Sequence, residues 1–232
     1  MDVYQTEEEQ VESIKKWWAE NSRSIIFGVG LGLFAIFGWQ SWQEQTRTHT
    51  LEASDIYQQL TKSLKDSKYE AVLLLAKEIE ESYSDTPYAA LAGLQKAKIQ
   101  IEQAKKDEAI VTLDKVAATA GNNSIQHIAR IRSFRIRIGI GQMTDVISDI
   151  DAVINEQGGI NPGEFIGQYE ALKGDAYRLL GDVEKARFGY IAALRTATLD
   201  RRLIQLKLDD LGPPPKKFAG ENASKNTEEP KK

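Results

Sequence analysis

The residues that could carry chemistry are few in this sequence, and none has the spacing of a catalytic or metal-binding set. The two histidines, His49 and His127, lie far apart, and neither belongs to an HExxH or comparable metal-binding motif. The chain has no cysteine, which excludes disulfides, thiol catalysis and cysteine-ligated metal centres. No GxSxG, Walker or SxxK motif is present. We therefore expect a protein that is not an enzyme and has no cofactor or metal, with His127 as a surface or packing residue.

Three closely spaced glycines could suggest a phosphate-binding loop. They lie in the segment GVGLG, but no strand precedes them and the spacing is not GxGxxG, so a dinucleotide site is excluded. Gly28 and Gly32 have instead the GxxxG spacing that lets two membrane helices approach closely. We predict that Gly28 and Gly32 form a membrane-helix contact.

These glycines belong to an apolar segment, residues 25–42, that contains no ionisable side chain. A helix of this length spans roughly 27 Å, close to the hydrocarbon thickness of a bilayer. A buried core helix and a cleaved signal peptide are the competing interpretations. The bulky Trp39 and Trp42, together with the acidic leader, disfavour cleavage, and tryptophans at this position are typical of a membrane interface. Residues 24–43 are therefore predicted to be a transmembrane anchor.

The basic residues around the anchor predict its orientation. Lys15, Lys16 and Arg23 precede the span, whereas Arg47 is the only basic residue close behind it. Such an excess of basic residues marks the cytoplasmic side. Residues 1–23 are thus expected in the cytoplasm, with a short amphipathic helix at the membrane surface, and the rest of the chain outside the cytoplasmic membrane, which is the periplasm if the source is a Gram-negative bacterium. The formal net charge of −4 argues against a nucleic-acid partner.

Behind the anchor, the pattern of residues 44–211 is helical and repetitive. The clearest unit, YEALKGDAYRLLGDVEKARFGYIAAL at residues 169–194, has the spacing of the tetratricopeptide (TPR) signature, in which small residues let two antiparallel helices touch. The predicted TPR packing residues are Gly174, Tyr177, Gly181, Ala186, Tyr190 and Ala193.

Fainter copies of this unit lie upstream. The expected counterparts of Ala186 are Val146, Ala109 and Ala71, at intervals of 40, 37 and 38 residues. Four positions after each of these four residues comes a larger apolar or aromatic one: Tyr190, Ile150, Leu113 and Leu75, respectively. We therefore predict an all-α chain in which a TPR-like solenoid of about four hairpins follows the anchor. A closing helix at residues 199–211 completes it. One conflict is RIRIGI, residues 135–140, which alternates like a strand. The proline- and lysine-rich residues 212–232 are expected to be a disordered tail.

The N-terminal QVESIKKWWAEN (residues 10–21), the anchor ending in GWQSW, and LKGDAYRLLGD (residues 172–182) together resemble the YfgM family of ancillary SecYEG translocon subunits. The similarity runs from about residue 4 to residue 211. The resemblance implies a periplasmic TPR domain tethered to the inner membrane. It also implies association with SecYEG and with a PpiD-type membrane-anchored chaperone, and a role in assisting newly exported proteins.

A TPR domain holds its ligands on the concave face formed by the first helices of its hairpins. At those positions this chain is unusually apolar, which favours unfolded or hydrophobic segments of newly exported polypeptides as clients. An alternative is that these side chains belong to the core. The predicted client contacts are Ile56, Leu60, Leu91, Leu94, Lys98, Ile101, Ile128, Ile131, Arg135, Ile138, Asp175 and Arg178, with Ala53, Gln168 and Ala171 at the remaining template positions.

Two functions remain open from the sequence. One is a client-binding, chaperone-like module at the translocon; the other is a structural scaffold that joins membrane complexes without binding unfolded clients.

Overall fold

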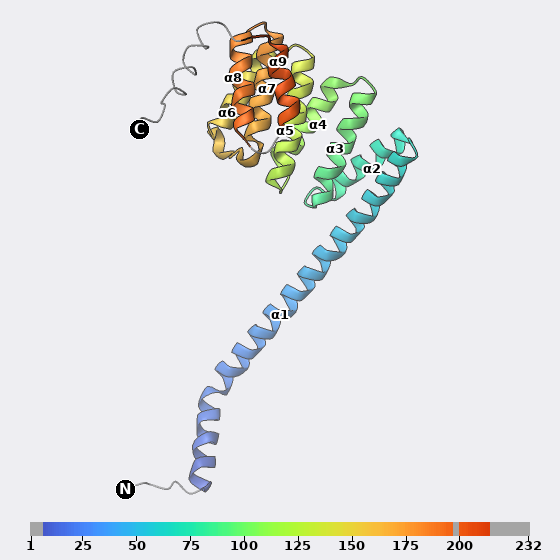
Figure 1. Cartoon of the computed structure of the whole chain (residues 1–232). Coiled ribbons are helices and arrows are strands. Elements are labelled where there is room, and N and C mark those ends of the chain that lie inside the picture. The colour runs from blue at the N-terminus through green and yellow to red at the C-terminus, as the bar shows by residue number, and fades with distance from the viewer. Residues whose placement is uncertain (1–6, 197–199, 214–232) are drawn as a thin grey trace, which may run out of the picture. The chain divides into compact units, whose positions relative to one another are not determined.

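The computed structural model describes residues 7–196 and 200–213, and every regular element in these ranges is a helix (Figure 1). The expected all-α class is confirmed, and RIRIGI falls at the end of helix α5 (Asn123–Gly139). Residues 1–6 of the predicted cytoplasmic segment, Leu199 at the predicted start of the closing helix, and residues 214–232 of the predicted tail lie outside the described residues. The chain divides into two compact units, Met1–Gln58 and Gln59–Lys232.

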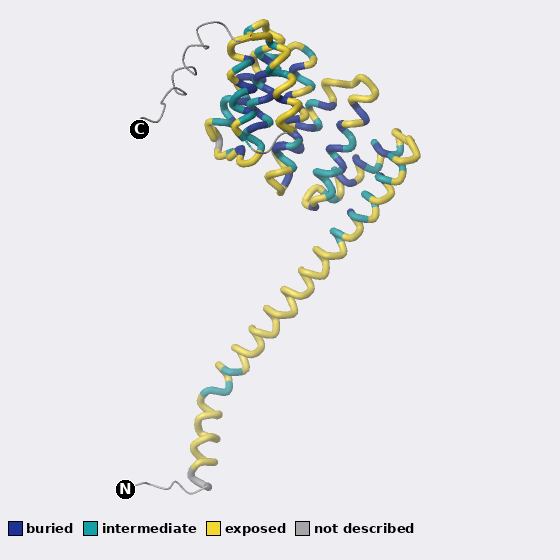
Figure 2. The backbone as a smooth tube through the Cα atoms, in the orientation of Figure 1, coloured by how far each residue is buried: buried dark blue, intermediate teal, exposed yellow. Residues whose placement is uncertain are grey.

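The first unit is built on α1 (Glu7–Lys65), which contains the predicted anchor. Its most apolar window has a mean hydropathy of 1.5, none of it is buried, and it is long enough to cross a membrane. Figure 2 shows this stretch as almost entirely exposed, and Phe27 has 82% of its surface open. An exposed apolar surface of this extent is typical of a segment that inserts into a membrane or packs against another protein. The predicted boundaries at residues 23 and 43 stay predictions, because the helix runs through both.

The second unit consists of antiparallel helical hairpins and a final single helix. The end of α1 leads into α2, and three further helix pairs follow (Figure 1). The helices are α2 (Tyr69–Ser82), α3 (Pro87–Glu102), α4 (Lys106–Thr119), α5, α6 (Met143–Ile154), α7 (Ile166–Leu179), α8 (Val183–Arg195) and α9 (Arg201–Asp210). Two short 3-10 turns, Gln157–Gly159 and Gly163–Phe165, lie between α6 and α7.

Each hairpin turns through the same hydrogen-bonded motif. In the last one, Gly181 has a φ of +81°, its N–H donates to the Arg178 carbonyl (3.1 Å), and the Asp182 N–H donates to the Tyr177 carbonyl (3.0 Å). This is a Schellman motif, in which a residue with positive φ satisfies the last carbonyls of a helix. The same pair of bonds surrounds Ser67, Ala104 and Gly141, so the turn residues recur at intervals of 37, 37 and 40 residues. The four turn residues therefore occupy equivalent positions in the four hairpins.

The turn register predicts how single glycines act on stability. Gly141 has a φ of +94°, so Gly141→Ala should destabilise the domain by about 1 kcal/mol, because a Cβ crowds the following carbonyl in the left-handed region. Gly139→Ala is the matched control, since Gly139 is the last residue of α5 and a Cβ there meets nothing within 4 Å. Thermal melting of the full chain in detergent should place only Gly141→Ala below the wild type. Equal midpoints for the two variants would contradict the turn assignment.

The turns also fix the register of the second helix in each hairpin. Five residues after each turn residue comes a fully buried residue, and a second fully buried or nearly fully buried residue lies four positions further on. Ala109, Val146 and Ala186 occupy the first position as predicted, but in the first hairpin Val72 takes it rather than Ala71. The second position is held by Ala76, Leu113, Ile150 and Tyr190, so Leu75 is likewise shifted by one residue.

The predicted closing helix is present as α9, which begins at Arg201. Its Ile204 is buried in one cluster with Ala186, Tyr190 and Ala193. Lys207 of α9 reaches across to Asp175 of α7 at 2.6 Å. The helix therefore covers the apolar side of the fourth hairpin, which would otherwise face water.

Candidate functional site

Of the predicted packing residues, Gly174, Ala186 and Tyr190 meet between α7 and α8 of the fourth hairpin, whereas Gly181 lies in the turn, where a Cβ would meet nothing within 4 Å. Gly174 lies against the Tyr190 ring, where an added Cβ would come within 2.6 Å of two ring carbons and 3.2 Å of the Ala186 carbonyl. The Tyr190 hydroxyl donates to the Asp175 carboxylate (2.8 Å). Burial, together with this bond, raises the pKa of Tyr190. The close contact expected between Ala186 and Gly174 is therefore present.

Sequence reasoning missed Gly189, which forms the closest contact of the two helices. A Cβ at Gly189 would lie 2.8 Å from the Gly174 nitrogen and 2.9 Å from the Glu170 carbonyl oxygen. Both neighbours are backbone atoms, so α7 and α8 touch through glycine on glycine. The only signal in the sequence was a second small residue on α8, one turn after Ala186.

The predicted client contacts divide into a buried and an accessible group. Leu60, Leu94, Ile131 and Ile138 are buried, and Ile131 and Ile138 lie in the core cluster around Tyr169. These four side chains cannot reach a ligand without opening the helices. Ala53 and Ala171 are also buried, whereas Ile56, Leu91, Ile128, Gln168 and Asp175 are half-buried. The exposed members are Lys98, Ile101, Arg135 and Arg178.

The accessible part of this face is more polar than the sequence indicated. Ile101 is 42% exposed, and the other exposed members of the predicted set, Lys98, Arg135 and Arg178, are cations. Lys98 lies 3.9 Å from Glu102, and Arg178 lies 3.3 Å from Asp210. Leu94, Lys98 and Ile101 lie ten, six and three positions before the turn residue Ala104. The same positions in the first hairpin, counted back from Ser67, are Tyr57, Thr61 and Leu64. The first two lie one residue beyond the predicted Ile56 and Leu60.

In the anchor, the glycine face is open. A Cβ at Gly28 or Gly32 would meet no other atom within 4 Å. The face predicted to contact another membrane helix therefore has nothing packed on it in the described part of the chain.

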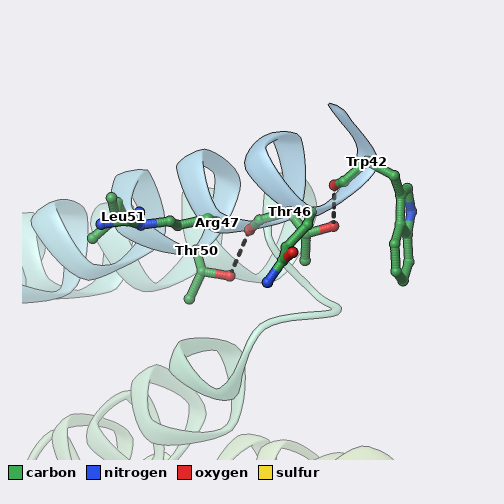
Figure 3. A pocket seen from close by; sticks show the side chains of 6 residues that line it. Trp42, Thr46, Arg47, Thr50 and Leu51 are labelled. Atoms are coloured by element: carbon green, nitrogen blue, oxygen red, sulfur yellow. Dashed lines mark hydrogen bonds between the residues drawn. The ribbon is translucent and has the colours of Figure 1, made fainter. Parts of the chain in front are cut away.

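Figure 3 shows a shallow hollow farther along α1, with a volume of about 360 Å³. Its walls are Trp42, Gln43, Thr46, Arg47, Thr50 and Leu51, all from this one helix. The hydroxyls of Thr46 and Thr50 each donate to the backbone carbonyl four residues earlier. These hydroxyls are already satisfied by the helix, and no second element closes the hollow, so it provides no basis for a ligand site.

His127 is a packing residue, buried between α5, α7 and the connection from α6 to α7. Its Nε2 lies 3.0 Å from the Asn161 carbonyl, which can only accept, so Nε2 carries the proton. The Tyr169 hydroxyl therefore donates to Nδ1 (2.8 Å), and the Phe165 ring stacks on the imidazole at 4.9 Å. No group of side chains able to hold a metal ion occurs among the described residues.

This histidine predicts a pH dependence of stability. Burial lowers the pKa of His127, and the nearby charge of Arg130 acts in the same direction. A folded-state pKa below the unfolded value of about 6.5 means that stability is full above pH ~6.5 and is lost as the pH falls through the folded pKa. The melting midpoint should therefore be lower at pH 5.5 than at pH 7.5. His127→Gln should flatten this difference, whereas His49→Gln should leave it; an unchanged difference in His127→Gln would contradict the assignment.

Comparison with known proteins gives one consistent result. A family model described as "Tetratricopeptide repeat-like domain" matches residues 15–213. A protein named "Ancillary SecYEG translocon subunit" from Escherichia coli (strain K12) is 24% identical over 213 residues, which cover 91% of this chain and 99% of that protein. Proteins of the same name from Haemophilus influenzae and Aggregatibacter actinomycetemcomitans are 25% and 29% identical, covering 90% and 88% of this chain and 100% and 97% of theirs. No solved structure matches.

Proposed function

Since the chain belongs to the tetratricopeptide repeat-like family, whose model spans residues 15–213, we propose that it is a membrane-anchored, non-enzymatic protein-binding subunit of the Sec translocon. The observation that carries this proposal is the match to ancillary SecYEG translocon subunits over about nine-tenths of the chain. The match includes both the apolar α1 and the helical repeats. Within residues 7–196 and 200–213, no group of side chains is placed to hold a metal ion, and the proposal assigns binding rather than catalysis to both parts.

Its finer role, in this proposal, is to hold newly exported polypeptides as they leave the translocon, next to a PpiD-type chaperone. The N-terminus is cytoplasmic and the repeat domain periplasmic, since the basic residues gather before the span. Clients bind along the accessible residues of the first helices, which offer Ile101 and half-buried Leu91 and Ile128 among charged side chains, several of them ion-paired. Burial of apolar client segments supplies the affinity, so binding is weak and broad.

Photocrosslinking from this face in intact membranes tests the proposal. A benzoylphenylalanine at Ile101 or Arg135 should trap newly exported proteins, whereas one at Val111 should trap several-fold less, because Val111 is 69% exposed on a second helix of the repeat. Leu94 and Ile131 are unsuitable positions because they are buried. Products restricted to translocon subunits from every position would favour the scaffold function instead.

A further inference from the structure

A cavity of about 500 Å³ lies in the second unit, outside the predicted client face. It opens between the α2–α3 connection, α3, the end of α4 and the start of α5, and apolar atoms form most of its wall. The side chains at its floor are small: Ala89, Ala90 and Gly93 on α3. Val116 and Ile125 close it from α4 and α5. None of the predicted client contacts lines it.

The cavity lies at the junction of the second and third hairpins, and two of its lining residues, Ala90 and Ile125, occupy positions that hold rings one repeat later. Counted from the turn residues, Ala90 corresponds to His127, fourteen positions before the turn. Ile125 corresponds to Phe165 and the buried Ala129 to Tyr169, sixteen and twelve positions before their turns.

In the later repeat these positions hold three mutually packed rings. The imidazole of His127 stacks on Phe165 at 4.9 Å and meets Tyr169 edge-on at 5.8 Å. The corresponding site between the second and third hairpins has two alanines and an isoleucine instead. The fold itself thus shows which side chains fit this junction, and a volume of about 150 Å³ is enough for one benzene ring.

The charges at the edge of the cavity narrow the ligand class. Glu80 is its one carboxylate from α2, and it is held by Lys115 at 2.5 Å and by Lys96 at 2.8 Å. Burial would raise the pKa of Glu80, but the hydrogen bonds from Lys115 and Lys96 outweigh it and keep that pKa below its ordinary value. The Glu80 carboxylate is therefore ionised and already paired, and Asp85, the second carboxylate that lines the cavity, is not without a partner either, so little remains to attract a charged side chain. Threonines at positions 112 and 119 and Asn122 add neutral polar groups.

We propose that this cavity is a docking site for an uncharged aromatic side chain carried by a bound polypeptide. The inference rests on the proposed protein-binding role and adds to that role a second binding surface, separate from the predicted client face. An aromatic ring is the occupant because the molecule places rings in the equivalent junction, where His127, Phe165 and Tyr169 pack against one another on the corresponding helices.

A peptide titration tests the site directly. The probe is a short Gly-Ser peptide with one central 4-fluorophenylalanine. Its fluorine NMR signal is monitored while the full chain in nanodiscs is added. Unlabelled peptides with phenylalanine at that position should compete, and peptides with lysine or alanine should not. Ala90→Leu fills the cavity and should weaken binding by about tenfold to a hundredfold, the value of one buried aromatic side chain. Ala118→Leu is the matched control, since Ala118 is exposed on α4 outside the cavity and should bind like the wild type.

A second variant guards against misfolding. Thr119→Phe places a ring at the mouth of the cavity and removes only a hydroxyl that bonds the Lys115 carbonyl of its own helix. It should also lose the peptide while melting like the wild type. Undiminished binding in both Ala90→Leu and Thr119→Phe would overturn the proposal. So would tighter binding by a chain ended at Leu211, because its own Phe218 would then be the occupant.

The outcomes separate this inference from the proposed function. If the cavity variants bind the peptide normally and Ile101 still crosslinks to exported proteins, only the aromatic site is wrong. If the wild type neither binds the peptide nor crosslinks to exported proteins from any face, the client-binding role itself fails.

Discussion

Gly189→Ala is expected to unfold the fourth hairpin or lower its stability by about 3 kcal/mol, the upper end of the usual overpacking cost. The added Cβ would lie 2.8 Å from the Gly174 nitrogen, 2.9 Å from the Glu170 carbonyl oxygen and 2.9 Å from the Gly174 Cα. All three are backbone atoms, so no rotamer change can relieve the contact. The helices α7 and α8 must move apart, which loosens the packing of Tyr190 and of Ile204 in α9.

Gly93→Ala provides the informative comparison. There the added Cβ would meet only the Val116 Cγ2, at 2.5 Å, and that methyl belongs to a side chain that can rotate. We expect a smaller loss, roughly 1 kcal/mol. Chemical denaturation of the full chain in detergent, followed by limited proteolysis between α7 and α9, measures both variants. A Gly189→Ala protein as stable as Gly93→Ala would show that the two helices do not touch through their backbones.

The fourth hairpin could be predicted from the sequence because its turn and its contacts use glycine. Gly174 and Gly181 stand out in the sequence; Gly174 lies at the contact between α7 and α8, whereas Gly181, predicted as a packing residue, is the left-handed turn residue. In the first and second hairpins the same left-handed turn position is occupied by Ser67 and Ala104, which give no such signal. Without a visible turn residue, the first hairpin was placed one residue early, on Ala71 instead of Val72.

The client face could not be separated from the core by pattern alone. A first helix in this domain packs against its own partner and against the next hairpin, so apolar residues occur on most of its circumference. Ile131 and Ile101 look alike in sequence, yet Ile131 is 2% exposed and Ile101 is 42% exposed. The cavity could not be predicted from the sequence for a related reason. Ala90 and Ile125 are ordinary helix residues, and only their alignment with His127 and Phe165 shows the missing volume.

The orientation of the anchor should give an all-or-none result in cysteine labelling, because the chain has no cysteine of its own. Gln10→Cys lies before the span and Ser148→Cys lies on α6, and both positions are exposed. A membrane-impermeant maleimide added to spheroplasts should label Cys at position 148 fully and Cys at position 10 only after lysis. The physical reason is the cost of moving Lys15, Lys16 and Arg23 across the membrane, against only Arg47 on the other side.

Removing that charge difference should remove the preference. In the triple variant Lys15→Gln, Lys16→Gln and Arg23→Gln, Arg47 is the only basic residue left close to the span, so part of the population should insert with the repeat domain inside. Each single-cysteine reporter should then be labelled partially in intact spheroplasts. Full labelling at position 10 and protection at position 148 in the otherwise unchanged chain would reverse the proposed topology. It would also place the repeat domain outside the compartment where exported proteins emerge, and this would contradict the client-binding role.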